Sequence, residues 1–547
     1  MKKPEKKAGV LILTIVILFV MAVPVSAQDD FGFGFDDGTG GAADSTAGGK
    51  LITGAGIGGK VSAGLQFFFD DGMDPDKLKA AELSDIFSGA LNFKASGSNA
   101  EGVINLNLTP NFAEPEKILS IDEAYMRAFF GSLNIEGGIR KLTWGKADTL
   151  GPLDVINPLD YRDLSNIADP QSIKTARPLI HASYGTGNFS KVEGVFVPWL
   201  EGAKFSQTGR WAPAQVTKMA EDIEGKITSD MTARMGGLIA LNPGWVTAVG
   251  GMSNLMGMLS SINPVDGLSA IDQSAILPQT LGLEYAQGGL RYTTTFGSVD
   301  FGVQYYSGFN PRPAMRLNQV GYNALQTAIQ DYYTAYMTAY IASTETNPVN
   351  KAAVATVAAA SAKNAVQTAL AKLFDPAYNR YHQIGLDYAQ VLWSFNVRAE
   401  LAANITADLA GDDGLVYNPS LAWSFGFDRD IPVVGINANI QVNESIRLLD
   451  DKVGTDSLFD IEAGTNITST RLTASLSKSF FRNELELRTT AIWGIEDSDC
   501  YIIPAVTWTR GDITLEVSAG IFAGSKEGEL GQYRDNGFVK TVLSYSF

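Results

Sequence analysis

The stretch KTVLSYSF, residues 540–547, ends the chain and is the clearest guide to its fold. Successive side chains of a β-strand point to opposite faces, so every second residue shares a face. One face would be mostly apolar and end in aromatic rings: Val539, Thr541, Leu543, Tyr545 and Phe547. The other face would carry Lys540, Ser544 and Ser546. The pattern predicts a strand that runs to the last residue, with one apolar and one polar face.

A secretory signal peptide is predicted at the other end of the chain. Four lysines precede an almost unbroken apolar run, Gly9 to Met21, and Val25-Ser26-Ala27 is a small-residue cleavage site. About twenty apolar residues could also form an uncleaved anchor helix, but Pro24 and the small residues after it favour cleavage. We expect residues 1–27 to be a signal peptide for export. The Gly- and Asp-rich residues 28–50 are expected to form a flexible periplasmic segment.

The composition excludes several classes of function. The formal net charge is −17 and becomes −20 once the signal, with four Lys and Glu5, is removed. Nucleic-acid binding needs a basic face, so it is not expected. Cys500 is the single cysteine and cannot form an intramolecular disulfide. With two His and one Cys, neither a metal site nor a cofactor is predicted.

Alternating apolar and polar residues recur along residues 51–547 and predict eighteen strands. They lie near 53–69, 86–97, 101–109, 119–130, 133–145, 175–184, 189–199, 282–296, 299–308, 380–391, 393–404, 417–427, 433–446, 467–479, 483–495, 501–509, 512–523 and 537–547. Tight joints such as Gly131-Ser132, Gly297-Ser298 and Arg510-Gly511 alternate with long ones. Short periplasmic turns and long external loops are typical of outer-membrane barrels. We therefore predict an all-β, antiparallel transmembrane barrel of about 18 strands, with 16 as the alternative.

Two long insertions interrupt the strands. Residues 317–374 have helical spacing of tyrosines and an Ala-rich second half after Pro348, which predicts a helical hairpin in an external loop. The hairpin could plug the barrel or cap it. Residues 200–281 form a long apolar loop with an amphipathic helix expected near 213–234. That loop is too apolar to be free in water, so it should enter the barrel mouth, pack on the hairpin or meet a partner chain.

Several motifs resemble those of a known family. The closing strand resembles that of bacterial outer-membrane barrels, in which the last strand, here with Tyr545 and Phe547, is also the assembly signal. Residues 139–163, IRKLTWGKADTLGPLDVINPLDYRD, contain a W-G…D…N-P-x-D loop, and GLDYA at 385–389 with RAE at 398–400 forms a G-x-D-x-A…R-x-E hairpin. These motifs resemble a poorly characterised family of porin-like barrels from bacteria with two membranes.

The resemblance implies a single-chain barrel in the outer membrane that conducts passive transport. Its expected partners are outer-membrane lipid and the barrel assembly machinery, and a homo-oligomer is left open. The leading function is a channel for passive diffusion of small hydrophilic solutes. Uptake of an apolar ligand, suggested by the Met-rich 200–281 loop, and a surface adhesin or structural barrel are the alternatives.

Strand parity turns a set of charged side chains toward the lumen, where they are predicted to line the pore. They are Arg127, Arg140, Arg177, Arg291, Arg398, Glu400, Arg471, Glu486, Arg488 and Glu516. Arg140 and Arg398 are expected to influence ion preference most. The Gly288-Gly289 pair predicts a β-bulge, because the alternation shifts between Glu284 and Arg291.

An enzymatic barrel is not expected. His181 should face the lumen and His382 the apolar side, and neither lies in a nucleophile motif. Acidic residues 70–76, together with Asp148, Asp154, Asp160 and Asp163, do not match a calcium loop. We interpret these acids as solvated external groups.

Overall fold

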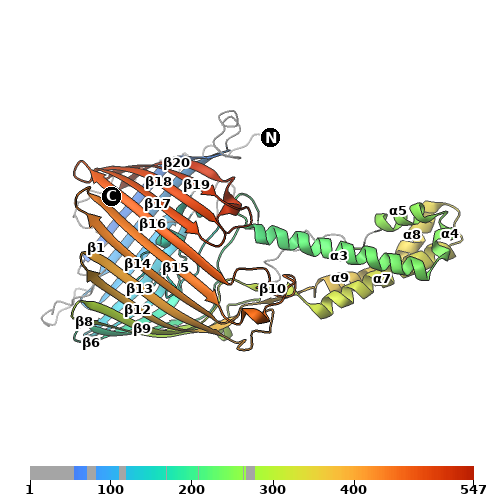
Figure 1. Ribbon diagram of the computed structural model, residues 1–547, viewed down its shortest axis with the longest axis horizontal. Helices are drawn as coiled ribbons and strands as arrows, with labels where there is room; N and C mark the ends of the chain where they lie inside the picture. The colour runs from blue at the N-terminus through green and yellow to red at the C-terminus, as the bar shows by residue number, and fades with distance from the viewer. Residues whose placement is uncertain are drawn as a thin grey trace.

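Within the described residues, eighteen antiparallel strands close into one barrel (Figure 1). This computed structural model describes residues 54–69, 82–109, 119–167, 169–206, 208–262, 264–265 and 278–547. Each strand pairs with its neighbours in the chain, and β1 (Gly54–Phe69) pairs with β20 (Gly537–Ser546) to complete the ring. The predicted fold class and the strand number of 18 are confirmed. The predicted signal peptide, the 28–50 segment and the acidic run 70–76 lie outside the described residues.

The remaining barrel strands follow the chain in order. They are β2 (Glu82–Ser96), β3 (Ala100–Leu108), β4 (Leu119–Phe130), β5 (Leu133–Arg140), β6 (Arg177–Gly187), β7 (Ser190–Val197), β8 (Gln287–Phe296), β9 (Val299–Phe309), β12 (Arg380–Leu392), β13 (Phe395–Thr406), β14 (Ser420–Ile431), β15 (Ile436–Arg447), β16 (Thr468–Phe480), β17 (Leu485–Gly494), β18 (Asp499–Arg510) and β19 (Ile513–Ala523). A separate two-stranded sheet joins β10 (Ala314–Leu317) to β11 (Phe374–Ala377).

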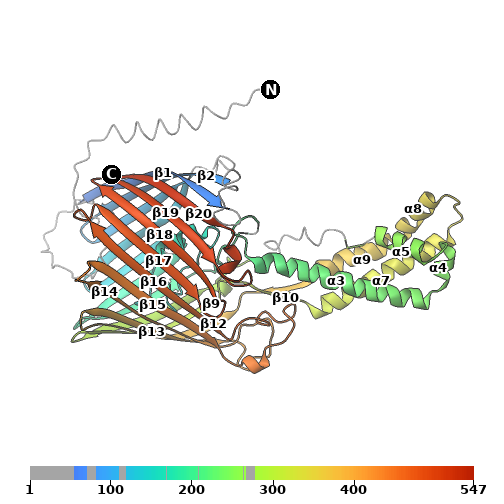
Figure 2. The same cartoon turned by 45° about the horizontal axis from the view of Figure 1, so that its top comes forward.

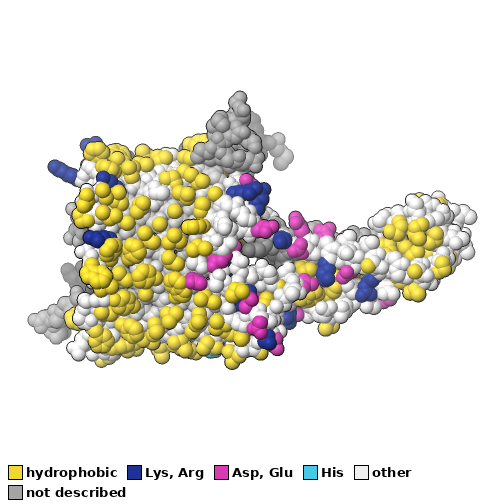
Figure 3. Space-filling model, in the orientation of Figure 1, with side chains coloured by type: hydrophobic (Ala, Val, Ile, Leu, Met, Phe, Trp, Pro, Cys, Tyr) yellow, Lys and Arg dark blue, Asp and Glu magenta, His cyan; other side chains and the backbone are white. Residues whose placement is uncertain are grey.

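The two faces of the wall divide as the alternation predicts. Ile180, Leu290 and Leu401 are exposed on the outside, where a membrane barrel needs apolar side chains. Hydrophobic side chains cover most of the barrel surface seen in Figure 3. Inside, Ser62 of β1 and Ser544 of β20 bond through their hydroxyl oxygens at 2.9 Å. The closing seam therefore has a polar inner face.

Tight turns join the strands at one end of the barrel and long loops at the other. Gly131 (φ 64°) and Gly297 (φ 61°) occupy the left-handed conformation that two-residue turns require. The carboxyl terminus lies at the tight-turn end (Figure 1). This end corresponds to the predicted periplasmic side, so the long loops are on the opposite side.

Two details of the sequence prediction are wrong. The predicted strand 133–145 ends at Arg140, because the chain turns into the barrel from Lys141. The predicted bulge at Gly288-Gly289 is absent, since both glycines pair in regular register with β7 and β9. The apparent shift arose because Glu284 belongs to a 3₁₀ turn before β8 and not to the strand.

The two long insertions pack on each other and form a stalk of helices. Its helices are α3 (Ala214–Leu241), α4 (Gly244–Ala248), α5 (Met252–Ser261), α7 (Gln319–Ala342), α8 (Pro348–Ala358) and α9 (Ala360–Leu370). Their buried side chains form one apolar core that includes Leu255, Tyr332 and Tyr336. The stalk extends away from the loop end of the barrel (Figure 2). The helical insertion is therefore neither a plug nor a cap, and the 200–281 loop packs on it.

Among the described residues, hydropathy identifies no helix with the length and apolar character needed to cross a membrane.

Candidate functional site

The loop between β5 and β6 turns inward and binds the opposite part of the wall. Glu400 of β13 accepts hydrogen bonds from the backbone N–H groups of Lys146, Ala147 (2.7 Å) and Leu153 (3.3 Å). Gln441 of β15 accepts from the N–H groups of Asp148 and Thr149 at 2.9 and 3.1 Å. Because β13 and β15 lie well around the ring from β5, the loop must cross the interior. We call residues 141–163 the inward loop.

Glycine is required where the inward loop meets Glu400. Gly145 has a φ of 102°, and a Cβ on it would lie 2.3 Å from Glu400 Oε1. A Cβ on Gly151 would lie 2.4 Å from Oε2 of the same carboxylate. Only a residue without a side chain allows the backbone to approach this closely.

The other motif residues hold the loop to itself and to the wall. Trp144 is 1% exposed and packs edge-on against Tyr306 with ring centroids 6.4 Å apart. Asn157 accepts from Leu142 N at 2.7 Å and donates to the backbone oxygens of Arg140 and Thr175 at 3.0 Å each. The W-G and N-P elements quoted from the sequence therefore stabilise a crossing loop.

Two of the acids predicted to be solvated are engaged inside the barrel. Asp154 forms a buried ion pair with Lys174. Asp148 accepts from Arg398 of β13 at 2.5 Å and from Asn439 at 2.9 Å. Burial raises the pKa of Asp148, although Arg398 and Asn439 oppose this rise. The interpretation of these residues as external solvated acid is wrong, because the loop carries them inward.

A charged cluster lies where four parts of the chain converge. It consists of Tyr161 of the inward loop, Arg312 between β9 and β10, Arg471 of β16 and Glu529 between β19 and β20. We call these four residues the junction cluster. Arg471 pairs with Glu529, and their side chains are 34% and 43% exposed. The Arg312 guanidinium lies 5.8 Å from the centre of the Tyr161 ring. The charge of Arg471 lowers the pKa of Glu529, which favours the ionised carboxylate.

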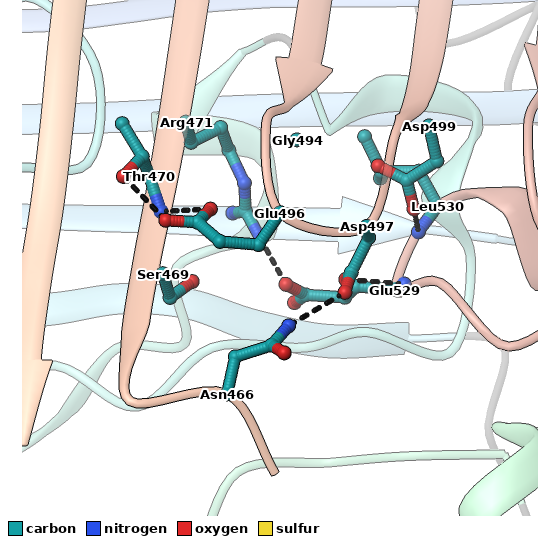
Figure 4. Close-up of a pocket in the computed structure, with 10 residues that line it drawn as sticks. All are labelled: Asn466, Ser469, Thr470, Arg471, Gly494, Glu496, Asp497, Asp499, Glu529 and Leu530. Carbon is teal, nitrogen blue, oxygen red and sulfur yellow. Dashed lines mark hydrogen bonds and ion pairs between the residues drawn. The ribbon is translucent and has the colours of Figure 1, made fainter.

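Figure 4 shows Arg471 and Glu529 in a small cavity at the loop end of β16 to β18. The cavity holds about 20 Å³, roughly the space of one water molecule, and Asp497 and Asp499 also line it. Asp499 Oδ2 accepts from the N–H groups of Leu530 and Gly531 at 2.6 and 2.9 Å. These acids therefore hold the β19–β20 loop beside Arg471.

Apolar side chains fill the interior on both sides of the inward loop. One cluster contains Leu142, Trp144, Ile156, Leu179, Val195, Val197 and Tyr306. The other contains Phe68, Leu164, Trp211, Ile492, Tyr501, Phe522, Leu530, Tyr533 and Phe538. Since several of these are inward residues near the loop ends of their strands, the outer half of the lumen is narrowed by packed loops.

All ten charged residues predicted to line the pore lie on the inward register, but their surroundings differ. Three are buried: Arg177, Arg291 and Glu400. Arg177 donates to the Ile156 carbonyl at 3.0 Å, and Arg291 to Asp387 at 2.8 Å. These three support the loop or the wall and are not free to meet a solute.

The other seven keep partial exposure and are mostly paired with opposite charges. Arg127 binds Glu101 and Glu136 at 2.9 and 2.5 Å, and Arg140 also pairs with Glu136. Arg398 bridges Asp148 and Asp428. Arg488 lies 3.3 Å from Glu486. Arg471 belongs to the junction cluster, and Glu516 faces Thr507 across the β18–β19 ladder. Their role in lining the pore stays a prediction.

Both histidines lie on the faces that parity predicts. His181 lies between Glu136 and Glu193, with 3.3 Å from a ring nitrogen to each carboxylate. His382 bonds to the Tyr305 hydroxyl at 2.8 Å on the outer face. In the described part of the chain, no group of three or more His, Cys, Asp or Glu is arranged to hold a metal ion.

Sequence reasoning missed Arg312 and Glu529. Both lie in loops, where strand parity gives no direction. The turn Asn310-Pro311-Arg312-Pro313 directly after β9 was the available signal, because two prolines fix the backbone around one charge.

Comparisons with known proteins find likeness in backbone only. No protein-family model matches the sequence, and no curated protein matches it. OccAB2 of Acinetobacter baumannii matches with a TM-score of 0.43 and 7% identity over 91% of this chain and 99% of that one. The outer membrane protein OpdK of Pseudomonas aeruginosa matches with a TM-score of 0.41 and 8% identity, over 91% of this chain and 99% of that one. OmpF of Salmonella typhi matches with a TM-score of 0.37 and 7% identity, over 90% of this chain and 97% of that one. At these values the likeness assigns no function, and the barrel rests on this chain's own strand pairing.

Proposed function

We propose that this protein is an outer-membrane channel for passive diffusion of small hydrophilic solutes. The observation that carries the proposal is the junction cluster. Arg471 and Glu529 lie where loops from several parts of the barrel converge, yet a third or more of each side chain is exposed to water. Charged groups that stay hydrated at the narrowed part of a barrel are what a diffusion pathway requires.

The pathway carries charges of both signs at the junction cluster, because Asp497 and Asp499 line the cavity that holds Arg471 and Glu529. Arg471 and Glu529 compensate each other, and Arg312 adds one positive charge beside Tyr161. Further in, Arg127 and Arg488 pair with carboxylates, so the wall has little excess charge. We therefore expect small hydrophilic solutes to pass, with little preference between anions and cations.

Location and biogenesis belong to the same proposal. An apolar outer face favours insertion in a bilayer, and the leader over residues 1–27 favours export to the outer membrane. The W-G…D…N-P-x-D and G-x-D-x-A…R-x-E motifs favour the porin-like family that they resemble. Assembly would use the outer-membrane barrel machinery, with Tyr545 and Phe547 as its signal.

The other functions considered for this protein have less support or can accompany a channel. An apolar ligand would need free apolar surface inside, but Trp211, Phe522 and Tyr533 pack on one another with ring centroids 5.6 to 6.0 Å apart. An enzymatic role is not proposed, because His181 faces two carboxylates and His382 faces Tyr305 on the outer side. A surface-binding role for the stalk can coexist with a channel.

Planar-bilayer recording with purified protein tests the proposal. We expect stable ohmic steps and a reversal potential close to zero in a salt gradient. Arg312→Gln should move the reversal potential toward cation preference, because it removes one positive charge from the junction cluster. Arg488→Gln is the matched control, since that arginine is paired with Glu486 nearer the tight-turn end, and it should have a smaller effect. If correctly inserted protein carries no current, the channel proposal is refuted.

A further inference from the structure

The far end of the stalk exposes several apolar side chains. Leu241 ends α3, Met252 and Met256 lie on α5, and Val349 and Val357 lie on α8; these five residues are called the tip. Each is between 41% and 78% exposed. Figure 3 shows hydrophobic side chains gathered at this end of the stalk, and Figures 1 and 2 both place α4, α5 and α8 there. The tip is therefore an exposed apolar surface held far from the membrane.

The tip is almost free of charge. Residues 235–265 contain no Asp, Glu, Lys, Arg or His, and residues 332–362 contain only Glu345 and Lys351. Glu345 accepts from Asn350 at 3.2 Å, and the Lys351 ammonium lies 5.7 Å from the centre of the Tyr340 ring. The chain as a whole has 101 charged residues and a net charge of −17. A strongly charged partner would gain nothing at this surface.

We propose that the tip binds the tip of a second copy of this chain. Two acidic molecules repel over most of their surfaces, and the neutral tip is where two copies can meet without opposed like charges. Met252 and Met256 are one helical turn apart, and Val349 and Val357 are about two turns apart. In a dimer with a two-fold axis, the same apolar residues of α5 and α8 in each copy would face one another.

The composition fits helix packing better than a lipid surface. Segments that lie on membranes expose Trp, Tyr and basic side chains at the interface. Here Trp245 is 6% exposed, and the single basic residue of the tip helices, Lys351, lies over Tyr340. Ala352, Ala353 and Ala358 surround the valines of α8 with small side chains. Small neighbours allow helices to approach at the usual 8–10 Å.

Association between two tips is expected to be weak in dilute solution and stronger between proteins that share a membrane. The tip helices α5 and α8 have 10 and 11 residues, so they offer less than the roughly 800 Å² per partner of a standard stable interface. The stalk fixes the tip at a constant height, because α3 alone, with 28 residues, spans about 42 Å. Neighbouring barrels in one membrane therefore present their tips at the same level and at high effective concentration.

Cross-linking in proteoliposomes tests the proposal. Val357→Cys in a Cys500→Ser background, treated with a short bismaleimide, should give a covalent dimer. Val320→Cys is the matched control, because Val320 is 78% exposed at the base of α7. We expect at least a five-fold lower yield from the control. Equal yields would mean random collision and would overturn the proposal, as would no dimer from either variant.

Charge insertion gives an independent second test. Met252→Asp or Val349→Asp, each combined with Val357→Cys, should lower the dimer yield at least five-fold while the helix content by circular dichroism is unchanged. Two different sites are used so that one misfolded variant does not decide the result. Unchanged yield from both folded variants would overturn the proposal. Single barrels in nanodiscs that float with phosphatidylcholine vesicles, and lose this binding on Val349→Asp, would instead assign the tip to lipid.

Discussion

Glu400 is the residue on which the position of the inward loop most depends. Its carboxylate accepts from three backbone N–H groups of the loop and is itself 4% exposed. Gly145 and Gly151 allow this approach because a side chain on either would overlap the carboxylate oxygens. A single carboxylate therefore accepts from three backbone donors of the loop, as Asp and Glu do at capped helix ends.

Substitution of Glu400 should release the inward loop. Glu400→Ala leaves three loop N–H groups without this acceptor; the buried one of Leu153 costs about 1–3 kcal/mol, and the two partly buried ones cost less. Since the barrel wall keeps its own ladder bonds, we expect the barrel to fold while single-channel current becomes larger and noisier. Bilayer recording measures this change. Glu486→Ala is the control, because that inward glutamate pairs only with Arg488 among the ion pairs described; equal noise in both variants would contradict the assignment.

At the scale of elements, the loops inside the barrel are held by side chains of several strands. The β19–β20 loop is held by Asp499, which accepts from Leu530 and Gly531, and by the pair of Glu529 with Arg471. In the loop between β17 and β18, Glu496 accepts hydrogen bonds from Thr468 and Thr470 at 2.7 to 2.8 Å. Burial raises the pKa of Glu496, but these hydrogen bonds outweigh it and lower the pKa to about 2. Both loops are therefore held by carboxylates whose pKa is lowered below the usual glutamate value.

Acid should loosen the β19–β20 loop. The pKa of Glu529 is lowered in the folded protein, so its contribution to stability is complete above the unfolded value of about 4.3 and is lost as pH falls through the folded value. We expect current fluctuations to rise only once the pH falls below the unfolded glutamate value of about 4.3. Recording from pH 7 to 3 measures the transition. Glu529→Gln should already fluctuate at pH 7 and show no such transition; an unchanged transition would assign it to another group.

The two arms of the stalk should depend on each other. Leu255 and Leu259 of one arm and Tyr332 and Tyr336 of the other are buried in the same core. Removal of residues 319–372 alone would expose that core, so we expect aggregation in vitro and rapid proteolysis. Removal of both 214–277 and 319–372, with short Gly-Ser joints, should give a folded barrel of unchanged conductance. Gel mobility before and after heating reports folding; loss of conductance in the double deletion would place the stalk in the pathway.

At the scale of the whole molecule, closure of the ring depends on the pairing of the first and last strands. Phe547 donates its N–H to Gly59 O and accepts from Gly59 N through its carbonyl, both at 2.9 Å. A Cβ on Gly59 would lie 2.6 Å from the Phe547 ring, so the glycine makes room for the terminal aromatic residue. The terminal phenylalanine therefore has a structural place in the seam as well as its predicted role as an assembly signal.

Deletion of Phe547 separates these two roles. The seam loses two of its hydrogen bonds and keeps the ten paired positions from Lys60 to Phe69. We therefore expect nearly normal refolding from urea into detergent micelles, with a loss of about 1–3 kcal/mol. In cells, we expect strongly reduced insertion into the outer membrane, measured by fractionation. Equal defects in both assays would mean that the residue acts through the seam alone.

The barrel can be inferred from the residues alone, because a strand with a lipid face and a polar face must alternate residue by residue, and that alternation can be counted. The sequence therefore predicted the inward register of Arg398 and Arg471 and the helical character of residues 317–374. Tertiary structure decided what those positions do. Glu400 and Arg177 are covered by a loop that crosses the barrel, and Arg312 and Glu529 meet Arg471 from loops distant in the chain. Parity gives a side chain its direction, but burial and partners depend on where long loops fold, which no local pattern specifies.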